Sequence, residues 1–299
     1  MPFKIQDLGE LFKKTFKEWN DKDPFRQSAV IAYYAIFSIP GLLVLIIAIT
    51  GYFFGKDAVN ENILAQISST LGADTAAQIK EILIKASESK STIWGSIIGG
   101  ITILVGATGV FVELQVTLNA IWQVKVVPKT GILPILKARL FSFGLILAIA
   151  FLLTISLVLS TALAAVGMLI KGSDSAFVVM IFNVLNFVFS LVIISFLFAL
   201  MFKVLPDAKV QWKHVWLGSI LTGLLFTIGK TALAFYFSTA EPASVYGAAG
   251  SVILILLWVS YSSMILFFGA EFTFIYAKKY TGKVAPSDIA KVAILPKQQ

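Results

Sequence analysis

The sequence predicts an all-α polytopic membrane protein with six transmembrane helices, an N-terminal interfacial helix and two short extracytoplasmic helices. Two observations lead to this fold class. Of the 299 residues, 58% are apolar and only 13% are charged, too few charges to cover a water-soluble domain of this length. The apolar residues also form continuous runs that reach the about 20 residues a helix needs to cross a bilayer. These runs lie at 29–54, 93–122, 140–170, 176–202, 215–237 and 245–277.

The residues before the first run predict a helix that lies at the membrane surface. Apolar side chains recur at spacings of three and four, and lysines occupy the other side: Ile5, Leu8, Phe12, Phe16 and Trp19 against Lys13, Lys14 and Lys17. Proline is tolerated at a helix start, so Asp23-Pro24 predicts a turn into the first transmembrane helix. We therefore divide the chain into an interfacial helix over 1–27, a transmembrane domain over 28–278 and a tail over 279–299.

The 55–92 loop predicts the two short helices. Its apolar residues repeat at helical spacing in two runs, one on each side of Gly72. We interpret them as amphipathic helices that cover the outer face. A packing lid and a role in substrate recognition both stay open.

Positive charges predict the orientation. Eighteen of the 24 Lys and Arg residues lie in the N-terminal segment, the 123–139 and 203–214 loops and the tail. Because loops rich in Lys and Arg stay in the cytoplasm, both termini are predicted to be cytoplasmic. The net charge of +8 then faces anionic lipid headgroups, and no nucleic-acid partner is needed to explain it.

The composition argues against an enzyme. The chain has no cysteine and one histidine, His214, which excludes disulfides, thiolate metal sites and a cysteine nucleophile. The sequence also contains no phosphate-binding glycine loop. It contains no plausible catalytic set of a nucleophile, a general base and a residue that orients the base. We therefore predict no catalytic residue, no metal and no cofactor.

Ionisable residues within the apolar runs are the first functional candidates, because a charge in lipid is costly. They are Glu113, Lys230 and Glu271. Counting about 1.5 Å per residue from the cytoplasmic ends places the two carboxylates in one layer and the lysine deeper. Hydrogen bonding that holds the helices together is the alternative interpretation, and Lys230 can also extend its amine toward the membrane surface.

A polar group in the first run falls at the same depth. Pro40 removes a backbone hydrogen bond, so we expect a kink whose freed carbonyl needs a partner. Tyr33 and Tyr34 precede this kink, and Asn119 lies near Glu113. We predict a polar cavity in the cytoplasmic half, with these candidate residues: Tyr33, Tyr34, Ser38, Pro40, Glu113, Asn119, Lys230, Tyr246 and Glu271.

Five segments in order resemble the YihY/BrkB family of bacterial inner-membrane proteins, which formerly carried the name ribonuclease BN. They are Ala32-Tyr33-Tyr34 with Ser38 and Pro40, Leu118-Asn119-Ala120-Ile121-Trp122, Leu205-Pro206-Asp207 with Trp212, Tyr246-Gly247-Ala248-Ala249-Gly250-Ser251, and Leu257-Trp258 with Gly269-Ala270-Glu271. The resemblance covers nearly the whole chain. It implies six membrane helices, cytoplasmic termini, and links to serum resistance, virulence and export of envelope lipid.

Three functional hypotheses remain. The leading one is a transporter or exporter, flippase-like, of a lipid-like or other envelope-related molecule. The second is a non-transporting membrane scaffold for envelope integrity, which would assemble with itself or with other proteins through glycine-rich faces: Gly95, Gly99, Gly106, Gly109, Gly247 and Gly250. The third, a ribonuclease, is disfavoured because the predicted cytoplasmic loops contain no acidic cluster that could bind a divalent cation. Membrane lipids are the expected partners, and a homo-oligomer stays open.

Overall fold

The structure is a computed structural model of the whole chain. It describes residues 7–38, 60–61, 63–65, 67–68, 73–88, 108–126, 176–240, 249–281, 285–287 and 290–292. The predicted cavity residues Pro40 and Tyr246 lie outside these ranges.

Three long apolar helices form the centre of the described part. They are α7 (Ala176–Val204), α8 (Trp212–Ala240) and α9 (Gly250–Thr281). Each contains a candidate membrane span, so three of the predicted crossings appear as helices of the required length and composition. With 29, 29 and 32 residues, at about 1.5 Å per residue, they exceed the about 30 Å of a hydrocarbon core. They therefore tilt or extend beyond it.

The other predicted crossings are described only in part. The first run, 29–54, is helical as far as residue 38, in a helix that starts at residue 24. The second, 93–122, ends in the apolar helix Thr108–Ile121. The third, 140–170, lies outside the described residues, so six crossings remain a prediction.

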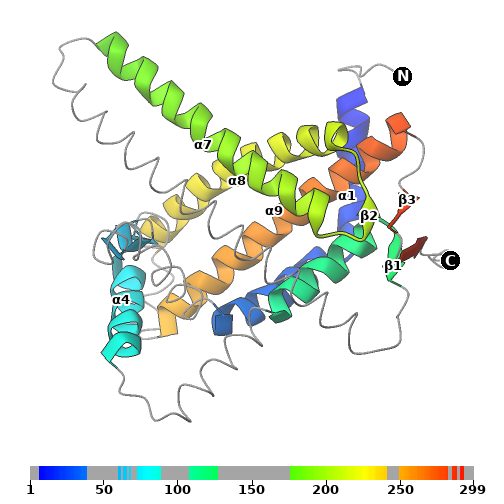
Figure 1. Cartoon of the computed structure of the whole chain (residues 1–299). Coiled ribbons are helices and arrows are strands. Elements are labelled where there is room, and N and C mark those ends of the chain that lie inside the picture. The colour runs from blue at the N-terminus through cyan, green and yellow to red at the C-terminus, as the bar shows by residue number, and fades with distance from the viewer. Residues whose placement is uncertain are drawn as a thin grey trace.

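Helix α8 lies between α7 and α9 and contacts both (Figure 1). Its contact with α9 uses two glycines and two threonines in a reciprocal arrangement. The Thr273 hydroxyl of α9 occupies the space that a side chain at Gly218 would fill. The Thr222 hydroxyl of α8 does the same at Gly269. Small residues let helix backbones approach closely in a membrane, so this Gly-xxx-Thr pair fixes how α8 and α9 cross.

Both threonines are also satisfied within their own helices. Thr222 donates a hydrogen bond to the Gly218 carbonyl at 2.6 Å. Thr273 donates one to the Gly269 carbonyl at 2.7 Å. The hydroxyls therefore leave no unpaired donor in an apolar environment. Among the glycines that the sequence indicated for close packing, Gly109 is described and holds the Tyr34 ring against it.

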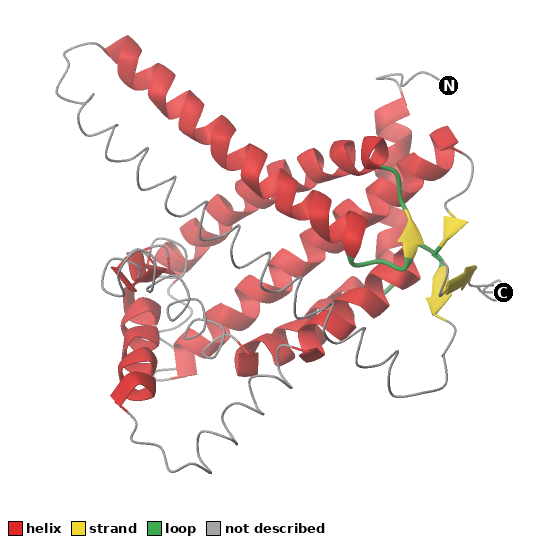
Figure 2. Cartoon of the chain, viewed as in Figure 1, coloured by secondary structure: helices red, strands yellow, loops and turns green. Residues whose placement is uncertain are grey.

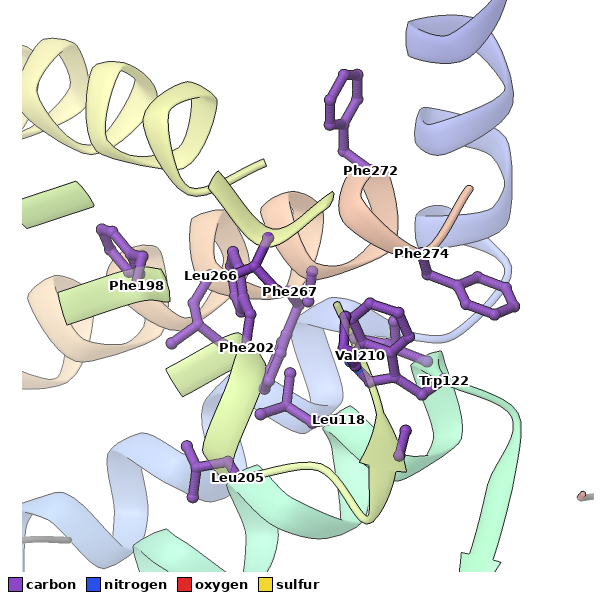
Figure 3. Close-up of a cluster of buried hydrophobic side chains, with 14 of the residues drawn as sticks. Leu118, Trp122, Phe198, Phe202, Leu205, Val210, Leu266, Phe267, Phe272 and Phe274 are labelled. Atoms are coloured by element: carbon purple, nitrogen blue, oxygen red, sulfur yellow. The ribbon is translucent and has the colours of Figure 1, made fainter. Parts of the chain in front are cut away.

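The main hydrophobic core gathers where α7, α9 and the helix Thr108–Ile121 meet. Figure 3 shows Phe202, Phe267 and Leu118 converging there. All three are fully buried. Trp122 packs beside them with its ring edge-on to Phe274, at 5.6 Å between centroids. This core makes one end of the bundle the tightly packed end.

The described part is mostly helical, as predicted, and four short strands at that end add to the helices (Figure 2). Strand β1 (Val124–Val126) pairs antiparallel with β4 (Ala290–Val292), and β2 (Ala208–Lys209) pairs antiparallel with β3 (Ala285–Pro286). The tail thus pairs with two loops of the bundle. The strands escaped prediction because segments of two or three residues carry no periodic pattern, and their pairing depends on the helices that bring the loops together.

Helix α1 (Leu8–Asn20) packs against the C-terminal part of α9. A turn over 21–23 follows, with Asp23 at a positive φ of 51°, and the next helix begins at Pro24 as the sequence predicted. Leu11 and Thr15 are buried, whereas Phe16, on the apolar side predicted to lie at the membrane surface, is 58% exposed. The aromatic residues flank the contact instead of filling it.

The opposite end carries the helices of the 55–92 loop. Helical residues occur between 60 and 68, followed by α4 (Ala73–Glu88), in agreement with two short helices. Figure 1 places α4 far from β1 and β2, beside the first turns of α9. The Ser251 hydroxyl donates a hydrogen bond to the Gln78 side chain there. The loop helices thus cover the end of the bundle opposite the strands.

Candidate functional site

Glu271 lies in the interface between α9 and α1. It stands ten residues before the end of α9 at Thr281, about 15 Å along the helix axis. Its side chain is fully buried, and the Lys22 amine donates a hydrogen bond to Oε2 at 2.7 Å. Lys22, at the end of α1, keeps 21% of its side chain exposed. The carboxylate predicted to lie in the membrane therefore has its cation partner on the N-terminal segment.

The same interface contains three buried polar atoms that have no hydrogen-bond partner among the described residues. They are Glu271 Oε1, Thr15 Oγ1 and Trp19 Nε1. Thr15 and Trp19 belong to the side of α1 that faces α9, and the Trp19 ring contacts Phe268 at 5.9 Å, one turn before Glu271. Buried polar groups are nearly always paired. These three atoms could therefore form hydrogen bonds with a small polar ligand or a water molecule.

Aromatic rings and a second ion pair surround these atoms. Phe12 of α1 contacts Phe272 at 5.4 Å and Phe268 at 6.2 Å between ring centroids. Figure 3 shows Phe272 pointing away from the main core, and this contact shows that it points to α1. Near the helix end, the Lys279 amine lies 2.9 Å from Glu10. The α1–α9 interface thus has a buried ion pair, Lys22–Glu271, at one end and an exposed ion pair, Lys279–Glu10, at the other.

Asn119 has a different environment from the one predicted. Its amide donates to the Asp207 carboxylate at 2.8 Å and accepts from the Asp207 backbone N–H at 2.7 Å. Gln115 donates to the same carboxylate at 3.1 Å, and the Asp207 carbonyl accepts from Ser287 N–H at 2.9 Å. Asn119 therefore fastens the α7–α8 loop, and Asp207 of that loop holds the tail.

Replacing Asn119 by alanine should destabilise this loop. Two hydrogen bonds would be lost, one of them to a carboxylate, and we expect about 1–2 kcal/mol less unfolding free energy. Gln115→Ala removes one longer bond and should cost less than about 1 kcal/mol. Detergent-induced unfolding of the two variants measures both, and equal losses would contradict the assignment.

The two tyrosines predicted for the cavity contact each other edge-on, with ring centroids 5.7 Å apart, but they differ in their other surroundings. Tyr33 is 60% exposed, whereas Tyr34 packs on Gly109 of the helix Thr108–Ile121. The Ser38 hydroxyl is buried and donates to the Ala35 carbonyl at 3.2 Å, within its own helix. Tyr34 and Ser38 therefore contribute to packing, and Tyr33 faces the surroundings of the bundle.

Glu113 and Lys230 are half-buried, and neither forms a hydrogen bond or ion pair with another described residue. No contact of that kind joins Glu113 to Glu271 in the described ranges. Lys230 follows Gly229, where the Tyr261 hydroxyl of α9 fills the space of the missing side chain. The structure thus groups Glu271 with Lys22, and it leaves Glu113 and Lys230 as separate polar positions.

Sequence reasoning missed Lys22, Glu18 and Thr15 as members of the site. Leu11, Thr15 and Glu18 recur at spacings of four and three along α1, and Lys22 lies in the turn that follows. Glu18 also interacts electrostatically with the Glu271 carboxyl group. A signal was present in the sequence, since a buried carboxylate needs a cation and Lys22 is the last lysine before the first apolar run.

These features define an integral membrane protein with several crossings: long apolar helices, close packing through glycines and a buried ion pair within a span. A family model described as Virulence factor BrkB matches residues 15–291. Because the match covers most of the chain, the chain belongs to this family.

Relatives from several bacteria are described as UPF0761 membrane proteins. The one from Saccharophagus degradans is 27% identical over 268 residues, which are 89% of this chain and 59% of the relative. The one from Teredinibacter turnerae is 24% identical over 268 residues, 89% and 60% of the two chains. That from Aggregatibacter aphrophilus is 25% identical over 283 residues, 90% and 92% of the two chains. The chain thus spans about three fifths of the first two relatives. No solved structure matches it.

Proposed function

We propose that this protein is a transporter or exporter, flippase-like, of a lipid-like or other envelope-related molecule. The observation that supports this best is the Glu271 carboxylate, which is fully buried in a membrane helix with one oxygen unpaired among the described residues. Ionisable groups inside membrane helices are costly and mark substrate or ion pathways. A purely structural ion pair needs no unpaired buried oxygen beside it.

The pathway would run along the interface of α1 and α9. This interface offers what an amphipathic molecule needs, a charged centre at Lys22 and Glu271 and aromatic rings beside it from Phe12, Phe268 and Phe272. We place the protein in the bacterial inner membrane with both termini cytoplasmic, because 18 of the 24 basic residues lie in the N-terminal segment, two loops and the tail, which are predicted to share one side. Access would then be from the cytoplasmic leaflet.

Of the glycines named for the scaffold alternative, the structure describes Gly109 and Gly250. The space beside Gly109 is filled by the Tyr34 ring of the same chain, so this glycine serves packing within the protein.

Reconstitution tests the proposal. Vesicles that contain the purified protein and an NBD-labelled phospholipid should expose the inner-leaflet label to dithionite faster than protein-free vesicles. Glu271→Gln should slow this exposure about tenfold or more, because it removes the buried charge. Glu10→Gln, which alters an exposed carboxylate of the same interface, should leave the rate unchanged. Wild-type vesicles no faster than protein-free ones, or a fully active Glu271→Gln variant, would contradict the proposal.

A further inference from the structure

A second carboxyl group lies beside the buried ion pair of the α1–α9 interface. Lys22, in the turn that follows α1, binds Glu271 at 2.7 Å. The carboxyl group of Glu18, in the last turn of α1, interacts with that of Glu271. Glu18 is 30% exposed and reaches Lys14 at 4.0 Å, whereas Glu271 is fully buried. Two carboxyl groups that share one site favour binding of a proton.

We propose that Glu271, Glu18 and Lys22 form a proton-binding site that controls how α1 docks on α9. The proton comes from the side of the membrane that carries α1 and adds to the free oxygen of Glu271, which is buried and has no partner among the described residues. The carboxylate becomes a neutral carboxylic acid and no other bond is made or broken. This inference deepens the proposed function by naming a proton as the ligand of the same site.

Protonation of Glu271 changes the interaction that Lys22 makes. When Glu271 is charged, the pair holds the end of α1 on α9. When Glu271 is neutral, the ammonium loses its counter-charge, and an unpaired charge at a buried site is costly. Glu18, in the last turn of α1 and four residues before Lys22, offers a second partner on the same segment of the chain. Because Lys22 is already 21% exposed, it can transfer to Glu18 by a change of rotamer.

Other titratable groups lie on the elements packed around this site. Lys278 of α9 is 5.5 Å from the centre of the Phe274 ring, and Lys22 is 5.8 Å from the same ring. His214 of α8 faces Tyr276, with ring centres 6.0 Å apart. Glu113, on the helix Thr108–Ile121, forms no hydrogen bond or ion pair with Glu271 within the described ranges. Near the start of α1, Lys279 is held by Glu10 and Asp7. Glu18 and Lys22 are thus the groups that set the charge state of this site.

Distance measurements between spin labels test the inference without any transport. The chain has no cysteine, so labels can be placed on Lys13→Cys of α1 and Gln211→Cys just before α8, both exposed and outside the site. In lipid nanodiscs at about pH 8 we expect one short distance, for docked α1. As the pH is lowered to about 5, the fraction of molecules with a second, longer distance should increase at least tenfold. The reason is that the ratio of protonated to charged carboxyl groups changes about tenfold per pH unit.

Variants separate the proposed cause from a general effect of acid. Glu271→Gln imitates the protonated acid and should show the longer distance at every pH. Glu10→Gln, in the exposed ion pair of the same helices, should keep the wild-type response. If Glu271→Gln does not fold, the wild-type titration still decides. A wild-type distance that is independent of pH, or a Glu271→Gln response equal to that of the wild type, would overturn the inference. A normal response in a protein that moves no lipid would overturn only the proposed function.

Discussion

Lys22→Met should lower the free energy of unfolding by about 3–5 kcal/mol, the usual cost of leaving one member of a buried ion pair without its partner. Methionine keeps the length of the side chain but removes the charge. Glu271 would remain fully buried with neither oxygen paired among the described residues. The loss should appear as earlier unfolding on addition of SDS to protein in mixed micelles.

The control for this experiment is Lys279→Met, which breaks the other ion pair between α1 and α9. Glu10 keeps 74% of its side chain exposed, so solvent screens that pair. Exposed ion pairs contribute less than about 1 kcal/mol, and the variant should unfold almost like the wild type. Equal destabilisation by the two methionine variants would show that burial of Glu271 does not set the strength of the interface.

Gly218→Ala should cost about 1–3 kcal/mol, the range for forcing extra atoms into a packed core. The new methyl group would occupy the place of the Thr273 hydroxyl, which also holds the Gly269 carbonyl at 2.7 Å. Helices α8 and α9 would have to separate, or Thr273 would have to change rotamer and lose its hydrogen bond. Gly269→Ala should give a similar loss, since Thr222 occupies the matching space.

Two further variants make this prediction specific. Thr273→Ala combined with Gly218→Ala removes the nearest overlapping atom and should recover part of the stability. Gly9→Ala lies in α1 with nothing within 4 Å of the added methyl group. It should stabilise the helix by about 0.5–1 kcal/mol, because alanine is the better helix former. A Gly218→Ala variant as stable as Gly9→Ala would contradict the reciprocal packing of α8 and α9.

The helices that the sequence predicted best are those whose signal is local. Long apolar runs located α7, α8 and α9 because lipid requires continuous apolar surface over a whole crossing. Pro24 located the start of the helix after α1, since proline fits the first turn. The strands were missed because β1 and β4 are three residues long and pair across most of the chain.

The candidate site was predicted less well than the fold. A charge within an apolar run is a local signal, and it singled out Glu271. The direction of each side chain around its helix does not follow from counting residues, so Asn119 was assigned to the cavity although it binds Asp207. The partner of Glu271 lies 249 positions away in the chain, in the turn that follows α1. Tertiary packing alone brings Lys22 to it.

The most direct test of this account is an exchange of the two charges, followed by SDS unfolding. Lys22→Glu alone places a third carboxyl group beside Glu18 and Glu271, and Glu271→Lys alone places two ammonium groups together. Both single variants should be strongly destabilised. The double variant, Lys22→Glu with Glu271→Lys, restores opposite charges at the α1–α9 interface and should recover at least half of the loss. A double variant no more stable than the weaker single variant would contradict a buried ion pair between Lys22 and Glu271.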